Sequence, residues 1–216
     1  TFITASYPTL FILENLLAET GTIVDISGKG DPHESTLSAR DVAAVHDSDL
    51  IVWYEGIQPA LDKAIQETSH SSKSLVDLSQ SGSDDPHVWL NPRGMMRGAQ
   101  KTTEALSLID PENEPTYREN LKTLIHKLAK LDSDYTDTLA KCETRTFVTS
   151  HAAFGHLAAA YDLNQVAVLS VGSHDEASAA SMAKAVKTIE KNNLSYVFEQ
   201  FDSDSAAKAL ANETGV

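Results

Sequence analysis

The longest helical pattern in the chain is TYRENLKTLIHKLAKLDSDYTDTLAK, residues 116–141. Apolar side chains recur in it every three or four residues and form one stripe: Tyr117, Leu121, Leu124, Ile125, Leu128, Leu131, Tyr135 and Leu139. At about 1.5 Å per residue such a helix measures about 39 Å, more than the width of a small lobe. The pattern therefore predicts a helix that connects two lobes.

Short apolar runs alternate with helical patterns on both sides of this segment. Before it, we expect strands at 2–6, 22–26, 49–54 and 74–78, and helices at 10–19, 38–46, 58–67 and 92–108. After it, we expect strands at 145–150, 165–169 and 195–199, and helices at 152–161, 177–191 and 203–213. This alternation predicts an α/β fold with mostly parallel sheets flanked by helices.

The same pattern predicts the domain organisation. We expect an N-terminal α/β lobe over residues 1–114, a linker helix over 115–142 and a C-terminal α/β lobe over 143–216. The second lobe stops where a further strand is expected, so we expect it to be truncated. The chain begins at Thr1 without Met, which is compatible with a signal peptide that has been removed.

Composition narrows the classes of partner. The 216 residues include 17 Lys+Arg and 31 Asp+Glu, which gives a formal net charge of −14. Nucleic acids and anionic membranes require a basic patch, so this balance argues against both. An acidic surface instead attracts cations. Cys142 is the single cysteine of the sequence, so a metal site has to use histidine and carboxylate side chains.

The tripeptide Asp-Pro-His occurs twice, at residues 31–33 and 85–87. Chance placement of these residue types predicts about 0.02 such tripeptides in this chain. Proline fixes its own φ and favours extended backbone before it, so each histidine lies on a stiff loop that suits a preorganised metal ligand. The Asp is placed to accept a hydrogen bond from the imidazole. We interpret His33 and His87 as metal ligands; the alternative is two turn residues without a ligand.

His151 is the third candidate ligand, because it follows an apolar strand at the edge of the sheet where α/β proteins bind ligands. The alternative is a helix-terminal histidine with an ordinary hydrogen bond. His156 is expected to point about 140° away around the following helix. Three imidazoles with one further position suit Zn²⁺, whereas Mn²⁺ prefers more carboxylate ligands.

The fourth position stays open at this point. Glu199 is a candidate fourth ligand or a partner of a ligating imidazole, and Asp85 is a candidate for the partner role. His70 lies in a Ser-rich loop, where it is either a transient metal-capturing residue or simply exposed. The sequence contains no nucleophile elbow, phosphate-binding loop or dinucleotide-binding motif, and we expect no catalytic residue.

At these residues the sequence resembles the metal-binding receptors of bacterial ABC importers for zinc and manganese, the cluster A-I substrate-binding proteins. The similar segments are GKGDPHE (28–34), DDPHVWLNP (84–92), YREN (117–120), SHAAFG (150–155), VFE (197–199) and ETG (213–215). The sequence departs from the family pattern at Asn91 and Ala152, where the family usually has Asp.

The resemblance implies two α/β lobes joined by one rigid helix, with the ion held between them. It implies ligands at His33, His87 and His151, and zinc rather than manganese, since manganese-binding members often have Glu at the third position. The usual fourth ligand of the family is an Asp that would lie beyond Val216.

We therefore expect an extracytoplasmic receptor, periplasmic or lipid-anchored at the cell surface, that captures Zn²⁺ and delivers it to an ABC permease. It is expected to be a monomer. One alternative is a manganese receptor or an adhesin on the same scaffold. The other is a zinc hydrolase in which Glu199 would serve as general base to a metal-bound water.

Overall fold

The computed structural model describes residues 1–216 except 18–19, 29–31, 69–73, 172–176 and 200–204. The chain divides into two compact units, Thr1–Asp132 and Ser133–Val216. The division falls inside the long helix α5 (Glu114–Leu139). Within the described residues, no helix combines the length and the apolar character that crossing a membrane requires.

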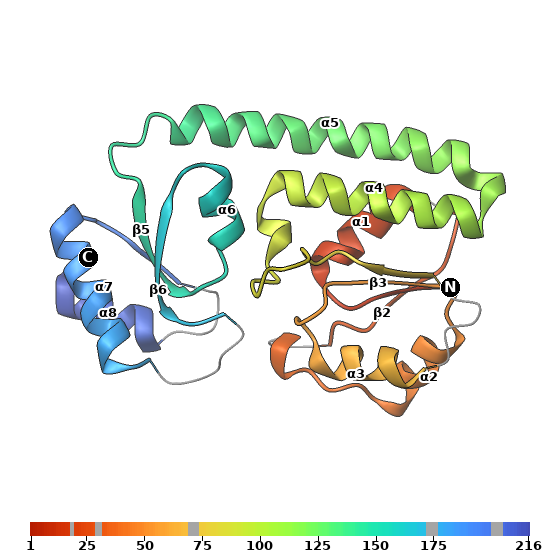
Figure 1. Ribbon diagram of the computed structural model, residues 1–216, viewed down its shortest axis with the longest axis horizontal. Coiled ribbons are helices and arrows are strands. Elements are labelled where there is room, and N and C mark those ends of the chain that lie inside the picture. Colours follow the sequence, from red (N-terminus) through yellow and green to blue (C-terminus); the bar gives the residue numbers. More distant parts are fainter. Residues whose placement is uncertain (18–19, 29–31, 69–73, 172–176, 200–204) are drawn as a thin grey trace. The chain divides into compact units, whose positions relative to one another are not determined.

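The first unit is built on a parallel four-stranded sheet (Figure 1). The strand order is β2 (Ile23–Asp25), β1 (Phe2–Thr4), β3 (Leu50–Trp53) and β4 (Ser74–Asp77). Ile3 is paired with Val24 on one side and Ile51 on the other. Because all four strands run the same way, their carboxyl ends meet at one edge of the sheet.

Helices bury both faces of this sheet. One face packs against α1 (Tyr7–Leu17), α4 (Pro92–Ile109) and the first half of α5, and the other against α2 (Ala39–Asp47) and α3 (Pro59–Glu67). Leu50 and Val52 point into the first core and Ile51 into the second. Alternate residues of each strand face opposite cores, which explains the continuous apolar runs in the sequence.

The second unit contains a smaller parallel sheet. Its order is β6 (Asn164–Leu169), β5 (Thr146–His151) and β7 (Val197–Phe198). Helices α7 (Ala179–Asn192) and α8 (Ser205–Thr214) share a core with the sheet residues Val148, Val166 and Val168. The short helix α6 (Gly155–Ala160) follows β5. The predicted α/β class with parallel sheets flanked by helices is confirmed.

Two helix starts show how local chemistry sets the boundaries. Ser38 begins α2 with a capping box, accepting from the Asp41 N–H while the Asp41 carboxylate accepts from the Ser38 N–H. Helix α1 begins at Tyr7, three residues before the predicted start. There the Ser6 carbonyl accepts from the Leu10 N–H, and Pro8 lies in the first turn, where a missing N–H costs nothing.

A partly buried hydrogen bond between Tyr117 of α5 and Asp110, just before this helix, gives a prediction about pH. Asp110 accepts from the Tyr117 hydroxyl at 2.5 Å and from Asn113 Nδ2 at 2.9 Å. These two bonds hold the pKa of Asp110 below its ordinary value, and the bond from Tyr117 has the larger effect. A carboxyl group whose pKa is lower in the folded than in the unfolded protein contributes stability at pH values above its unfolded-state pKa. This contribution disappears as the pH falls through the folded-state pKa.

We therefore expect Asp110→Asn to destabilise the first unit most at neutral pH. The difference from wild type should be constant above about pH 5 and shrink below about pH 4, since Asp has an ordinary pKa of about 3.9. Urea unfolding followed by tryptophan fluorescence at several pH values measures it. Glu112→Gln changes an exposed neighbouring acid and is the control. A difference that grows as the pH falls would contradict the assignment.

Candidate metal centre

The two Asp-Pro-His motifs meet within the first unit. His33 lies in the short 3₁₀ turn Pro32–Glu34, and His87 directly precedes the 3₁₀ turn Val88–Leu90. Their ring centroids are 5.7 Å apart with the planes at 63°. One ring nitrogen of His33 lies within 4.8 Å of one ring nitrogen of His87. Zn–N bonds measure about 2.0–2.1 Å, so both imidazoles are within reach of one ion after a small adjustment.

Asp85 fixes the orientation of His87. Its Oδ1 accepts from the His87 backbone N–H at 3.0 Å and lies 2.8 Å from His87 Nδ1. With the proton on Nδ1, that nitrogen donates to Asp85 and Nε2 presents its lone pair for a metal. The His87 residue is only 5% exposed, so the imidazole is held in a defined position before any ion arrives. Asp31, the matching residue of the first motif, lies outside the described residues.

Aromatic side chains wall this site on one side. The ring of Trp89 lies 5.1 Å from that of His87 and 4.9 Å from that of Tyr54. Tyr54 is buried at the end of β3, and its hydroxyl donates to Met95 Sδ at 3.6 Å. Burial, assisted by the Asp77 carboxylate, raises the pKa of Tyr54 far above its ordinary value. The phenol therefore stays neutral and does not offer a charged ligand.

His151 is the last residue of β5 in the second unit. Its carbonyl accepts from Thr149 Oγ1 at 2.8 Å and from Gln165 Nε2 at 2.9 Å. Gln165 Oε1 in turn accepts from the Phe154 N–H at 3.1 Å. These bonds fix the backbone at the carboxyl end of the strand, the place where parallel sheets carry ligand-binding residues.

The same bonds correct one prediction. The helix expected from Ala152 begins only at Gly155, because Gln165 on β6 binds the backbone on both sides of residues 152–153. His151 therefore lies on a strand, and the angle of about 140° expected between it and His156 around one helix does not apply. No local sequence signal marks Gln165, since its partners come from a neighbouring strand.

The remaining candidates stand as follows. Glu199 is exposed and directly follows β7, whose Phe198 is paired with Thr149 of β5. This register puts Glu199 level with Ser150, beside the residue that precedes His151. His70 lies outside the described residues.

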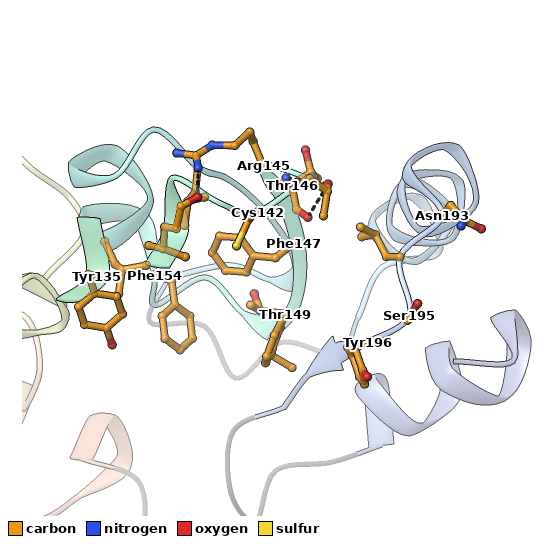
Figure 2. Close-up of a pocket in the computed structure, with 16 residues that line it drawn as sticks. Tyr135, Cys142, Arg145, Thr146, Phe147, Thr149, Phe154, Asn193, Ser195 and Tyr196 are labelled. Carbon is orange, nitrogen blue, oxygen red and sulfur yellow. Dashed lines mark hydrogen bonds between the residues drawn. The ribbon is translucent and has the colours of Figure 1, made fainter. Parts of the chain in front are cut away.

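The second unit also contains an apolar cavity of about 570 Å³ (Figure 2). Its walls include Phe147, Phe154 and Leu157 together with Cys142 and Arg145. The Arg145 guanidinium donates to the carbonyl oxygens of Leu139, Tyr161 and Asp162, so these N–H groups are paired with the backbone. The described residues that line the cavity include no imidazole or carboxylate.

Comparisons with known proteins identify similar chains. The family described as zinc-uptake complex component A, periplasmic, matches residues 3–216. The zinc-binding lipoprotein AdcA of Streptococcus pneumoniae is 30% identical over 239 residues, covering 99% of this chain and 48% of the relative. The high-affinity zinc uptake system protein ZnuA of Bacillus subtilis is 29% identical, covering 99% of this chain and 75% of the relative.

A solved structure agrees with these sequence matches. The crystal structure of the Zn(II)-bound ZnuA-like domain of Streptococcus pneumoniae AdcA is 30% identical, with a TM-score of 0.83. The match covers 100% of this chain and 84% of that one. The chain nevertheless spans only about half the length of the curated streptococcal relatives that it matches, 48% for AdcA.

Proposed function

Because the chain belongs to the family of periplasmic zinc-uptake complex component A, we propose that it is a receptor that captures Zn²⁺ outside the cytoplasm. The resemblance predicted from the sequence motifs is confirmed by this membership. The receptor would deliver its ion to the permease of an ABC importer. Relatives that are named zinc-binding or zinc-uptake proteins support the proposal.

The observation that carries the proposal is the pair of imidazoles in the first unit. A ring nitrogen of His33 and one of His87 lie within 4.8 Å of one another. Asp85 Oδ1 lies 2.8 Å from His87 Nδ1, an arrangement that leaves Nε2 for the metal. We assign the third ligand to His151, which the second unit presents at the carboxyl end of β5. Three imidazoles leave one position of a tetrahedral zinc for a further ligand. Glu199, beside β5, is the candidate for that position or for a hydrogen bond to a ligating imidazole.

The donor set favours zinc over manganese. Imidazole nitrogens suit zinc, whereas manganese is better served by carboxylate, carbonyl and water oxygens. The formal charge of −14 raises the local concentration of any cation and does not distinguish the two. The manganese receptor and the adhesin that the scaffold also allows find no support in the residues that the structure describes.

We propose binding without catalysis. A zinc hydrolase needs a general base that can reach the metal-bound water. Asp85 is committed to the His87 imidazole and backbone, and Glu199 is assigned to the fourth position or to a ligating imidazole, so neither carboxylate is left to act as that base. The proposed receptor acts as a monomer, either in the periplasm or tethered by a lipid anchor; nucleic acid is not among its partners.

A chelator-competition titration with Zn²⁺ and Mn²⁺ tests this function. We expect one zinc ion per chain and a clear preference for zinc over manganese. His151→Ala should weaken zinc binding at least about tenfold, because it removes a proposed ligand, while His156→Ala on α6 should leave it unchanged. Preferential binding of manganese would overturn the assignment of the metal. Tight zinc binding that survives His151→Ala would overturn the third ligand.

A further inference from the structure

Gln58 is a buried amide next to the proposed metal site. It directly precedes α3 and is only 2% exposed. Its Nε2 donates to Ser35 Oγ at 2.6 Å across a separation of 23 residues. We infer that Gln58 is a positioning residue that holds His33 for metal binding through Ser35, an inference that rests on the proposed function.

The backbone of Gln58 gives this side chain a fixed base. Its carbonyl accepts from the N–H groups of Leu61 at 2.9 Å and Asp62 at 3.1 Å, the first bonds of α3. Pro59 follows at the first helical position and restricts Gln58 to non-helical backbone. Gln58 therefore has little freedom to move relative to the helix that carries it.

Ser35 passes this constraint to the turn that carries His33. Its Oγ accepts from Gln58 and donates to the Pro32 carbonyl at 2.8 Å. Its N–H donates to the same carbonyl at 3.2 Å and so closes the turn around His33. One continuous chain of hydrogen bonds thus runs from Gln58, at the start of α3, through Ser35 to Pro32. Pro32 and Ser35 flank His33 and Glu34 in the sequence.

Supporting contacts hold the segments that carry both histidines. His87 is oriented by Asp85, two residues away in its own motif. The His33 turn is anchored from α3, a segment distant in the sequence. Both arrangements fix a ligand before the ion binds, and metal affinity depends strongly on such supporting contacts.

The burial of Gln58 supports a role beyond folding. Among the described residues, its Oε1 meets no hydrogen-bond donor. Burying an unpaired amide oxygen opposes folding, and an apolar side chain of similar size would avoid this penalty. Leucine at position 58 should therefore leave the stability of the unloaded protein unchanged or raise it, while removing the bond to Ser35.

Zinc titrations of Gln58→Leu and Ser35→Ala in the full chain test the inference. We expect each variant to bind zinc about tenfold more weakly than wild type, within the range for residues that orient a metal ligand. The double variant should be no weaker than the weaker single variant, because both act through one chain of bonds. In a His33→Ala background, Gln58→Leu should cause no further loss. The melting temperature of unloaded Gln58→Leu should equal or exceed that of wild type.

Thr103→Ala is the matched control. It removes a buried side-chain hydrogen bond of the first unit, from Thr103 Oγ1 to the Ala99 carbonyl at 2.9 Å, and should not alter zinc affinity. If Gln58→Leu does not fold, Ser35→Ala alone carries the test. Unchanged affinity in the two variants, or additive losses with His33→Ala, would overturn the inference while His33→Ala still upholds the metal site. A wild-type chain that binds no zinc would overturn the proposed function and this inference together.

Discussion

His87→Ala is expected to weaken zinc binding by more than about 100-fold. Replacing a residue that merely supports a ligand typically costs about 10–100-fold in affinity, and His87 is itself a proposed ligand. The residue is 5% exposed and Asp85 orients its imidazole, so little ordering remains to be done when the ion binds. Removing it deletes a preorganised donor that solvent cannot replace in the same geometry.

Two further variants make this experiment specific. Asp85→Asn keeps the imidazole but replaces its carboxylate partner, so its effect should fall between those of wild type and His87→Ala. His46→Ala removes an exposed histidine of the same unit, paired with Asp47 in α2, and should leave zinc affinity unchanged. Chelator competition at constant pH measures all three. Nearly wild-type affinity for His87→Ala would remove the basis for a site at the Asp-Pro-His motifs.

The regular parts of the fold follow from sequence patterns because they depend on local spacing. Alternate residues of the buried strands, such as Leu50 and Ile51, pack into opposite cores. The sequence of each strand is therefore a continuous apolar run. The two Asp-Pro-His motifs are equally local, and both predicted ligands of the first unit lie side by side.

Contacts between distant segments could not be predicted in the same way. The link from Gln58 to Ser35 joins two turns, and the bonds of Gln165 to the backbone around His151 join two strands. Nothing near these glutamines in the sequence indicates their partners. The alanines at 152–153 favour a helix by propensity, yet hydrogen bonds from Gln165 delay its start to Gly155, so tertiary contacts override propensity there.

Gly94 connects the packing of the first unit with its metal site. It lies in the first turn of α4, where an added Cβ would come within 2.3 Å of the Val88 carbonyl oxygen and 2.7 Å of Val88 Cγ1. Val88 is buried and directly follows His87, and its carbonyl also accepts from the Asn91 N–H at 3.2 Å. Alanine at position 94 must therefore displace the backbone that carries the proposed ligand.

We expect Gly94→Ala to destabilise the first unit by up to about 2 kcal/mol, since overpacking typically costs about 1–3 kcal/mol and the gain in helix propensity returns only about 1 kcal/mol. Zinc affinity should fall at least about tenfold as His87 moves. Both tryptophans, Trp53 and Trp89, lie in this unit, so fluorescence-detected urea unfolding reports on it directly.

Gly98→Ala, one turn later on the same helix, separates the two effects. The atoms nearest to its Cβ would be methyl carbons of Leu78 at 3.2 Å and Ile12 at 3.3 Å, which can shift by a few tenths of an ångström. This variant should stay within about 1 kcal/mol of wild type because the propensity gain offsets the tighter packing, and its zinc affinity should not change. If Gly94→Ala loses stability but binds zinc like wild type, the Val88 backbone does not position His87. If both glycine variants lose affinity equally, α4 acts on the site through its general packing and not through the contact with Val88.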